Sequence, residues 1–298
     1  GDGPLSTIKF DFRCSKDVVR RPGVDLVLGY NTAIFTLIQR LRGRKIAMNM
    51  DGVEWRRDKW GMFAKTWFYI NEFSGSHLAT LPIADHPEIG RHLRRHGCQR
   101  AKVIPYASAR VASAPTTPIE SMGLTPGNYL VSIARIEPEN SILEIVRAFT
   151  AKPRRAKLVI LGKLLPGNAY HQKVRSAGDG AVLFPGAIYD KQTVEALRVH
   201  ALAYVHGHQV GGTNPSLVEA LGCGNAVVAH DNCFNRWVAG EGQYYFRNEA
   251  QLGEVFDRLD LNDPFLEEAR KLAAQRHAEA FTFDNVHAQY ERLLTSLL

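Results

Sequence analysis

The sequence predicts an α/β protein built from two parallel-sheet domains, and two observations carry that prediction. Short apolar runs alternate with amphipathic stretches of helical period along most of the 298 residues, which is the pattern of stacked strand–helix–strand units. A stretch rich in Pro, Ser, Thr and Ala at residues 108–127 lacks this periodicity and divides the chain into two series. We expect domains at 1–112 and 128–280, a linker at 113–127 between them, and a C-terminal helix at 281–298 that packs back towards the first domain.

Each series has its own expected elements. In the first series, strands are expected at Val24–Gly29, Lys45–Met50, Leu78–Ile83 and Lys102–Pro105, and helices at Thr32–Leu41, Lys59–Ser76 and Pro87–Gly97. In the second, strands are expected at Tyr129–Ala134, Lys157–Leu161, Ala181–Phe184, Ala203–His206, Ala226–His230 and Gln243–Phe246. Helices are expected there at Ser141–Thr150, Tyr170–Ala177, Lys191–His200, Pro215–Leu221, Glu249–Leu259 and from about Pro264 onward, with a break near Phe281–Asp284.

The first series has too few strands for a full doubly wound domain. It also opens at Gly1–Ser6 without a strand and a glycine-rich turn. We interpret the N-terminal domain as incomplete, with an initial strand–helix–strand portion absent from this chain. A small first domain is the alternative interpretation.

Composition places the chain among globular proteins of the cytoplasm. Hydrophobic residues make up 45% and charged residues 22%, close to the average for folded proteins. The four cysteines have neither metal-binding spacing nor a disulfide pattern, which fits a reducing compartment. No apolar run reaches membrane-spanning length, and we identify no signal peptide.

The positive charge is concentrated in the first series. Residues 1–112 contain 19 Lys and Arg against 10 Asp and Glu, a net charge of +9, while the remainder contains 18 against 20, a net charge of −2. A basic half implies an anionic partner, such as nucleic acid, lipid headgroups or a substrate with a pyrophosphate.

The strongest candidate site is the run GGTNPSLVEALGCG at residues 211–224, which follows the strand expected to end at His206. Its glycines permit tight turns and close approach of a ligand. A polar N-cap followed by proline predicts the start of a helix, whose free N–H groups and positive dipole end suit a phosphate. The residues that we assign to this site are Gly211, Gly212, Thr213, Asn214, Pro215 and Ser216.

Three charged residues extend this site. Glu219 shares a helix face with Ser216 and suits the sugar hydroxyls of a nucleotide; the alternative is a capped helix with a solvent-exposed glutamate. Arg135 and Lys163 each follow the end of an expected strand. Because parallel strands end at the same crevice, the two cations are expected to converge on a diphosphate.

These segments carry a resemblance to a known family. The run VGGTNPSLVEALGCGNAVVAHD, with SIARIEPEN and VILGK upstream, resembles the donor domain of glycosyltransferase family 4, which has the GT-B fold of two Rossmann-like domains facing across a cleft. The run MDGVEWRRDKWGMFAKTWF resembles a bacterial subgroup that includes rhamnosyltransferases and other polysaccharide-building enzymes.

The resemblance implies a retaining, metal-independent transfer of a sugar from a nucleotide-diphosphate donor. It implies that Arg135 and Lys163 hold the diphosphate and Glu219 the ribose, with Ile188 and Tyr189 near the base. The family usually carries a second glutamate eight positions before Glu219, where this chain has Gly211. Backbone amides of Gly211–Asn214 are therefore expected to take over part of the binding of the donor sugar.

Candidate catalytic residues on the acceptor side are Asp51 and Glu54, which follow the strand Lys45–Met50. A carboxylate there can orient or deprotonate an acceptor hydroxyl. The alternative for Asp51 is an Asp-Gly turn in which its side chain bonds its own backbone. No protein nucleophile is assigned.

The aromatic helix of the first series has two interpretations. Trp60, Phe63, Trp67 and Ile70 recur at helical spacing beside basic residues, which fits either a core-facing stripe or a membrane-surface contact at the inner face of the cytoplasmic membrane. The second interpretation suits a lipid-diphosphate acceptor. The basic clusters match no nucleic-acid-binding motif, so no nucleic-acid partner is expected.

Two histidines, His206 and His208, flank Gly207 at the end of an expected strand. His208 is interpreted as a cleft residue and His206 as a packing residue; no metal ligands are assigned, and no cofactor is expected beyond the nucleotide-sugar substrate.

The function expected is transfer of a sugar to a glycan or a lipid-linked acceptor in bacterial polysaccharide or cell-envelope synthesis. The alternatives are a GT-B nucleotide-sugar epimerase and a non-catalytic protein that binds a nucleotide sugar or an anionic polymer.

Overall fold

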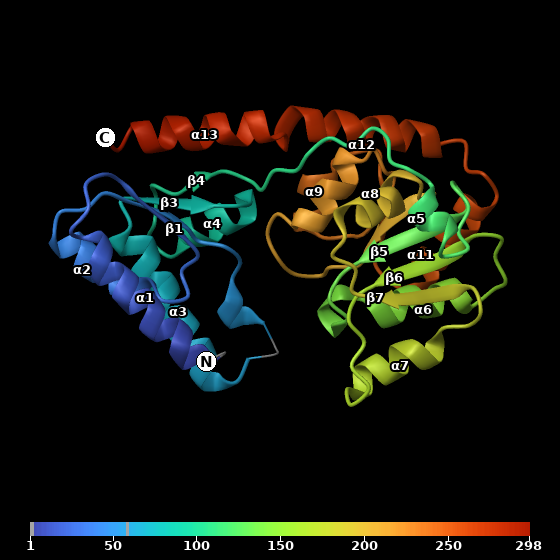
Figure 1. Ribbon diagram of the computed structural model, residues 1–298, viewed down its shortest axis with the longest axis horizontal. Coiled ribbons are helices and arrows are strands. Elements are labelled where there is room, and N and C mark those ends of the chain that lie inside the picture. Colours follow the sequence, from blue (N-terminus) through green and yellow to red (C-terminus); the bar gives the residue numbers. More distant parts are fainter. Residues whose placement is uncertain (1–2, 58–59) are drawn as a thin grey trace. The chain divides into compact units, whose positions relative to one another are not determined.

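The computed structural model describes residues 3–57 and 60–298, which form two compact units (Figure 1). Unit 1 comprises Gly1–Pro105 and Asp284–Leu298, and unit 2 comprises Tyr106–Phe283. Lys59, where the first long helix was expected to begin, lies outside the described residues. Among the residues that are described, no helix has both the length and the apolar character needed to cross a membrane.

Unit 1 is built on a four-stranded sheet with strand order β1-β2-β3-β4, in which every neighbouring pair is parallel. The strands are β1 (Asp25–Leu28), β2 (Ile46–Asn49), β3 (Leu81–Ala84) and β4 (Lys102–Val103). The helices are α1 (Pro4–Val18), η1 (Ala33–Phe35), α2 (Thr36–Leu41), η2 (Glu54–Arg56), α3 (Met62–Leu78), α4 (Pro87–Arg95) and α13 (Phe283–Thr295), η denoting a 3₁₀ turn.

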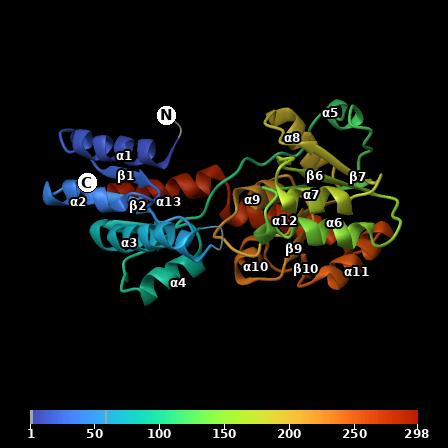
Figure 2. The ribbon, with the colours of Figure 1, turned by 90° about the horizontal axis from the view of Figure 1, so that it is seen from below.

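Strand β2 forms the centre of unit 1, because all four of its residues are buried. Helix α3 packs closely against this strand. A Cβ added to Gly75 of α3 would lie 2.7 Å from the sulfur of Met48 in β2 and 3.2 Å from the Cβ of Ala33 in η1. Glycine at this position therefore permits the approach of helix and strand. Figure 2 shows α3 and α4 next to each other within unit 1.

The structure departs from the expectations for unit 1 at α1 and at the start of β3. Helix α1 was not predicted, although the structure places it at the opening of the chain, where Phe12 contacts Phe35 edge-on at 5.3 Å. Strand β3 begins at Leu81, not at Leu78, because α3 continues to Leu78. In both cases packing against a neighbouring element, which local periodicity does not report, decides the structure.

The core-facing interpretation of the aromatic stripe was also wrong. Phe63 is 95% exposed and Ile70 is 43% exposed, whereas the buried residues of α3 are Asn71, Glu72, Gly75 and Ser76. Trp67 lies between these extremes and donates its indole N–H to the carbonyl of Asn31 (2.8 Å). The buried face of α3 is thus small and polar, and much of its apolar side faces solvent.

Unit 2 contains a six-stranded parallel sheet with strand order β10-β9-β8-β5-β6-β7. The strands are β5 (Tyr129–Ile133), β6 (Lys157–Leu161), β7 (Val182–Gly186), β8 (Ala203–His206), β9 (Val227–His230) and β10 (Tyr244–Phe246). The helices are α5 (Thr117–Glu120), η3 (Pro138–Asn140), α6 (Ile142–Thr150), α7 (Ala169–Ala177), α8 (Lys191–Val199), α9 (Pro215–Gly222), α10 (Cys233–Ala239), α11 (Glu249–Asp260) and α12 (Leu266–Ala280).

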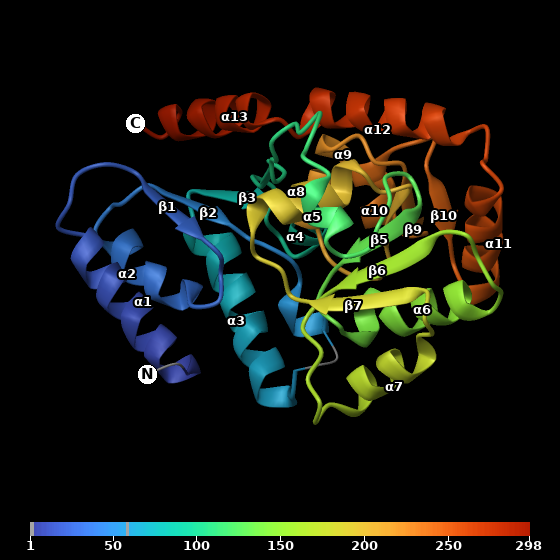
Figure 3. The same cartoon turned by 45° about the vertical axis from the view of Figure 1, so that its right-hand side comes forward.

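Helices cover both faces of this sheet, and the strand residues alternate between the two cores. On β5, Leu130 belongs to the cluster that contains α6, α7 and α11, while Tyr129 and Val131 belong to the cluster that contains α8, α9 and α10. Figures 1 and 3 show this layering, with α6 and α7 on one side of the sheet and α8 and α9 on the other. A parallel sheet covered on both faces is the doubly wound arrangement.

Two helices of unit 2 were not predicted. Helix α10 follows β9 and begins where the Asn232 side chain accepts the N–H groups of Phe234 and Asn235. Helix α5 lies in the stretch 113–127 that was expected to be a linker, and its Ile119 is fully buried in the core of unit 2. Both are short, so the helical period repeats too few times to be recognised in the sequence.

Candidate functional site

The N-terminus of α9 is built as the sequence predicts. The Asn214 side chain accepts the N–H of Ser216 (3.0 Å), and Pro215 occupies the first helical position. Gly211 has φ = +144°, a backbone conformation that side chains disfavour, while Thr213 is buried. The helix is thereby capped and held directly after the loop that leaves β8.

Ser216 connects this helix to the end of the neighbouring strand. Its hydroxyl lies 2.7 Å from the Tyr204 hydroxyl and donates to the Ile133 carbonyl at 3.3 Å. Tyr204 also donates to the Ile133 carbonyl (3.2 Å). The first turn of α9 is therefore fixed at the carboxyl end of β5, where open α/β sheets bind their ligands.

The strand register brings Arg135 and Lys163 to the same edge. Ile133 of β5 pairs with Leu161 of β6, and each cation lies two residues beyond its member of this pair. Both side chains are exposed, and neither forms an ion pair or a hydrogen bond with the residues that the structure describes. Figure 3 shows the two strands side by side. Two cations without counterions at one strand edge are available for an anionic ligand.

A glycine allows Lys163 to approach this edge. A Cβ added to Gly162 would lie 2.4 Å from the Ala134 carbonyl oxygen, so a larger residue would push the two strand ends apart. Gly207, at the end of β8, is confined in the same way by the Asn140 carbonyl oxygen at 2.3 Å. Close contact with a neighbouring backbone carbonyl thus explains the glycine at both positions.

Glu219 has a partner that sequence reasoning missed. Its Oε2 pairs with the guanidinium of Arg198, which is buried on α8 and also donates to the Ser216 hydroxyl (3.0 Å). The Glu219 side chain remains 46% exposed, and its Oε1 has no partner among the described residues. Arg198 thereby orients the carboxylate and leaves one oxygen free to accept hydrogen bonds.

His206 and His208 stack in parallel at the end of β8, with ring centroids 4.2 Å apart. Burial, reinforced by His208, lowers the pKa of His206 well below its ordinary value of 6.5. Both ring nitrogens of His206 are buried without a hydrogen-bond partner among the described residues. The His208 carbonyl accepts hydrogen bonds from Asn232 (2.9 Å) and Asn235 (2.8 Å), which fix the loop.

Tyr189 lies in the loop after β7, three residues beyond Gly186, which pairs with Leu161 of β6. Its side chain is 91% exposed, and neighbouring Ile188 is half-buried. Tyr189 therefore presents a free aromatic ring beyond the same strand edge from which Lys163 emerges.

In unit 1, Asp51 has the backbone conformation of a strained turn. Its φ is +46°, unusual for a residue other than glycine, and its N–H donates to Asn49 Oδ1 (2.9 Å). The Asp51 carboxylate is exposed and makes no hydrogen bond with the described residues, so the expected alternative, in which it bonds its own backbone, is not found. Strain of this kind is concentrated at functional sites.

Glu54 has a different environment. Its carboxylate contacts the guanidinium of Arg57 (3.1 Å) and accepts the indole N–H of Trp60 (3.1 Å). Tyr30, which sequence reasoning missed, accepts the N–H of Glu54 (2.9 Å) and donates to the Gly52 carbonyl (3.0 Å). These contacts make Glu54 a holder of the loop and leave Asp51 as the free carboxylate. Asp51 and Glu54 were assigned because they follow the end of an expected strand. Tyr30 also follows the end of a strand, β1, so the same reasoning could have found it.

One polar cluster was not anticipated. No metal ligands were assigned from the sequence, yet Glu72, His92 and His96 of unit 1 place one donor atom each within 4.8 Å of one another. Among the described residues, His206 and His208 do not gather a third ligand of this kind.

Two parallel-sheet units are the arrangement of the GT-B glycosyltransferase fold, which solved structures share with this chain. The chain belongs to the glycosyl transferases group 1 family, whose model matches residues 116–276. The match covers most of unit 2, including every residue assigned to the α9 site. A search of curated proteins found no match.

Solved structures share the fold across nearly the whole chain. Sucrose-phosphate synthase from Thermosynechococcus elongatus superposes with a TM-score of 0.80 at 17% identity, covering 99% of this chain and 81% of that one. HepE from Anabaena in complex with UDP gives a TM-score of 0.79 at 14% identity, with 95% and 81% covered. The α,α-trehalose-phosphate synthase (UDP-forming) from Burkholderia xenovorans gives 0.75 at 14% identity, with 97% and 76% covered.

Proposed function

We propose that this chain transfers a sugar from a nucleotide-diphosphate donor to a glycan or a lipid-linked acceptor in the synthesis of bacterial polysaccharide or cell envelope. The observation that carries the proposal is the strand edge of unit 2, where Arg135 and Lys163 emerge unpaired beside the capped start of α9. Structural relatives solved with UDP support a nucleotide-sugar donor. The resemblance of the first half to rhamnosyltransferases makes rhamnose the first donor sugar to test.

In this proposal the diphosphate lies against Arg135 and Lys163, at the positive end of the α9 dipole. Cations and a helix dipole stabilise the negative charge that develops on the leaving phosphate. The free Oε1 of Glu219 accepts hydrogen bonds from the ribose, while Arg198 holds the carboxylate in place. Tyr189, exposed in its loop, provides a surface for the base.

The chemical step that we propose retains the configuration of the sugar and needs no metal at the donor site. The bond between the anomeric carbon and the phosphate oxygen breaks, and its electron pair leaves with the diphosphate. The acceptor hydroxyl attacks from the same face and gives its proton to the leaving phosphate. The charge of the leaving group is then neutralised by Arg135 and Lys163, so neither a protein nucleophile nor a metal is required.

On the acceptor side we propose Asp51 as the carboxylate that orients the incoming hydroxyl. Its side chain is exposed, strained into place and without a hydrogen-bond partner in the described chain. Glu54, predicted as a second catalytic residue, is occupied by Arg57 and Trp60, and we assign it to holding the loop.

We also propose a peripheral contact between unit 1 and the inner, anionic face of the cytoplasmic membrane. The observation that favours it is the apolar side of α3, where Met62 (79%), Phe63 (95%) and Phe73 (55%) are exposed. Exposed apolar side chains on a basic unit suit an anionic lipid surface. Co-sedimentation with vesicles containing phosphatidylglycerol tests this contact, and Phe63→Ser is expected to weaken it.

The donor site is tested by calorimetric titration with UDP-, GDP- and dTDP-sugars. We expect one nucleotide sugar to bind selectively. Lys163→Ala should lower its affinity about 10- to 100-fold, because one charge-assisted hydrogen bond is lost. Lys173→Ala, which removes another exposed lysine of unit 2 on α7, is the matched control. Equal affinity of the Lys163 variant and the control would contradict the assignment.

Glu219 requires a conservative substitution. Removing its side chain as Ala would leave the buried guanidinium of Arg198 without its partner, so a loss of binding could reflect damage to the fold. Glu219→Gln keeps the shape and an acceptor oxygen, and it is expected to weaken binding less than tenfold. Incubation of the chain with the selected donor and a panel of lipid-linked and glycan acceptors then tests transfer itself.

A further inference from the structure

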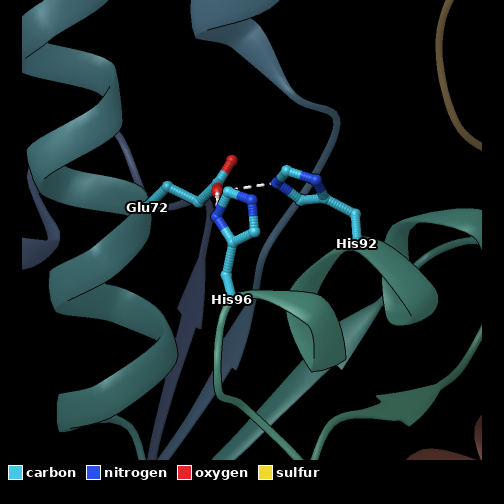
Figure 4. A group of neighbouring side chains, drawn as sticks. All are labelled: Glu72, His92 and His96. Atoms are coloured by element: carbon cyan, nitrogen blue, oxygen red, sulfur yellow. Dashed lines mark hydrogen bonds and ion pairs between the residues drawn. The ribbon is translucent and has the colours of Figure 1, made fainter.

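We infer that unit 1 contains a binding site for a divalent transition-metal ion, formed by Glu72 of α3 with His92 and His96 of α4 (Figure 4). The ion expected is Zn²⁺ or another borderline metal that favours imidazole nitrogen together with carboxylate oxygen. The site is separate from the proposed sugar transfer and does not depend on it, since every ligand belongs to unit 1.

The backbone places the three ligands before any metal is considered. His92 and His96 are four residues apart at the end of α4, so their side chains share one face of the helix. Glu72 faces them from α3, on the polar strip that is the buried side of that helix. Figure 4 shows both imidazole rings directed towards the carboxylate.

The distances between donor atoms are close to those of a metal site. Glu72 Oε1 lies 2.8 Å from His92 Nε2 and 3.6 Å from His96 Nδ1. Metal–ligand bonds of about 2.0–2.2 Å separate the donors of a tetrahedral site by about 3.3–3.6 Å. The Glu72–His92 pair therefore has to open by about half an ångström to admit an ion, and water can supply the fourth ligand.

The surroundings orient the carboxylate as a ligand needs. The Trp55 indole N–H donates to Glu72 Oε2 (2.9 Å), which leaves Oε1 directed towards the histidines. The Trp55 ring also stacks on His96, with centroids 6.4 Å apart, and Tyr69 contacts the same imidazole edge-on. Hydrogen bonds to the outer oxygen of a ligating carboxylate are typical of metal centres.

Burial and charge favour a cation at this place. Glu72 is 3% exposed and His92 is 8% exposed, and a buried carboxylate needs compensation by positive charge. One nearby positive charge opposes the binding of a metal ion. It is the guanidinium of Arg56, which lies over the Trp55 ring at 5.0 Å from its centroid.

The ion would connect two helices to the candidate acceptor loop. Trp55 belongs to η2, which lies between Asp51 and Trp60, and its indole is bonded to the metal-binding carboxylate. Metal binding is therefore expected to stiffen η2 as well as to join α3 to α4. A hydrogen-bonded cluster without a metal is the competing explanation of the same contacts.

The test uses the untagged full chain, stripped of metal with a chelator and titrated calorimetrically with ZnCl₂. We expect one ion bound per chain and a rise in the thermal midpoint. His96→Asn removes the half-exposed ligand and should weaken Zn²⁺ binding by more than about tenfold. Loss of a residue that merely supports a ligand already lowers metal affinity about tenfold or more. His77→Asn, which replaces an exposed histidine on α3 outside the cluster, is the control.

A second measurement protects the test against misfolding of the variants. Co²⁺ added to the stripped chain should give the visible absorption of a tetrahedral nitrogen–oxygen site, and His96→Asn should abolish it while the circular dichroism of the apo chain stays unchanged. Absence of Zn²⁺ binding, or equal affinity in His96→Asn and His77→Asn, would overturn the inference and leave a hydrogen-bonded cluster. Glu72→Gln should reproduce the loss that is seen with His96→Asn.

Discussion

The two units start several of their helices differently. In unit 2, five helices begin at an Asn or Asp whose side chain accepts backbone N–H groups, namely α7, α8, α9, α10 and α11. In unit 1, α1, α2 and α3 have no side chain that accepts a hydrogen bond at their N-caps. A cap is a local signal in the sequence, although it did not reveal the seven-residue helix α10. A helix without a cap depends more on what it packs against.

The interiors of the two units also differ, in how apolar the packing against each sheet is. The sheet of unit 2 is covered by two continuous apolar clusters, whose strand residues alternate strictly between the faces. The sheet of unit 1 is packed by a helix whose buried face is Asn71, Glu72, Gly75 and Ser76, while its large apolar side chains are exposed. Unit 2 thus resembles a scaffold with a site at its edge, whereas unit 1 places polar groups inside and apolar groups outside.

The largest effect is expected at the strand edge of unit 2. The double variant Arg135→Ala/Lys163→Ala removes both unpaired cations, at about 1.5–3 kcal/mol for each charge-assisted hydrogen bond. We expect kcat/KM for sugar transfer to fall about 10²- to 10⁴-fold, together with the nucleotide-induced rise in thermal midpoint. Lys173→Ala should leave both quantities unchanged. A double variant with normal nucleotide binding would move the donor site elsewhere in the chain.

Asp51→Asn separates the roles of the two units. A carboxylate that orients or deprotonates the acceptor contributes about 10²-fold or more to the rate, so kcat should fall by that order while the affinity for the nucleotide sugar stays unchanged. Glu54→Gln is the matched comparison, because it retains a hydrogen-bond acceptor for Trp60 and should have the smaller effect on kcat. A larger loss in the Glu54 variant would reverse our assignment of the two carboxylates.

Gly207→Ala and Gly75→Ala compare the packing of the units. The added Cβ at Gly207 meets a backbone carbonyl oxygen at 2.3 Å, which cannot move without shifting η3, and we expect a loss of about 1–3 kcal/mol in the free energy of unfolding. At Gly75 the nearest atom is the Met48 sulfur, on a flexible side chain, so the loss should be smaller. Chemical denaturation followed by circular dichroism gives both values; equal losses would show that unit 1 is packed as rigidly as unit 2.

The smallest effect is expected from pH. The pKa of His206 is well below 6.5 in the folded chain because of burial, so below about pH 6.5 the unfolded chain binds a proton that the folded chain does not. Stability contributed by the neutral imidazole is therefore complete above that pH and is lost as the pH falls. His206→Phe should flatten the decrease in thermal midpoint between pH 7 and pH 5; an unchanged slope would assign the acid sensitivity to other groups.

The donor side was predictable because its signals are local. The expected strands β6 and β8 agree with the structure at both ends, and the Asn-Pro start of α9 lies where the sequence places it. Strand ends in a parallel sheet share an edge, so Arg135 and Lys163 could be assigned to one place without coordinates. The roles of these residues stay predictions until ligand binding is measured.

The sequence by itself determined the α/β class, the two series of strands and the α9 site, since periodicity, caps and glycines act within a few residues. Only the tertiary structure decided which face of α3 is buried, that Arg198 orients Glu219, and that Tyr30 holds the Asp51 loop. It alone brought Glu72 to His92 and His96 across 20 residues or more of chain. Such contacts join groups from separate elements, and spacing along the chain reports only which residues share an element, not which elements meet.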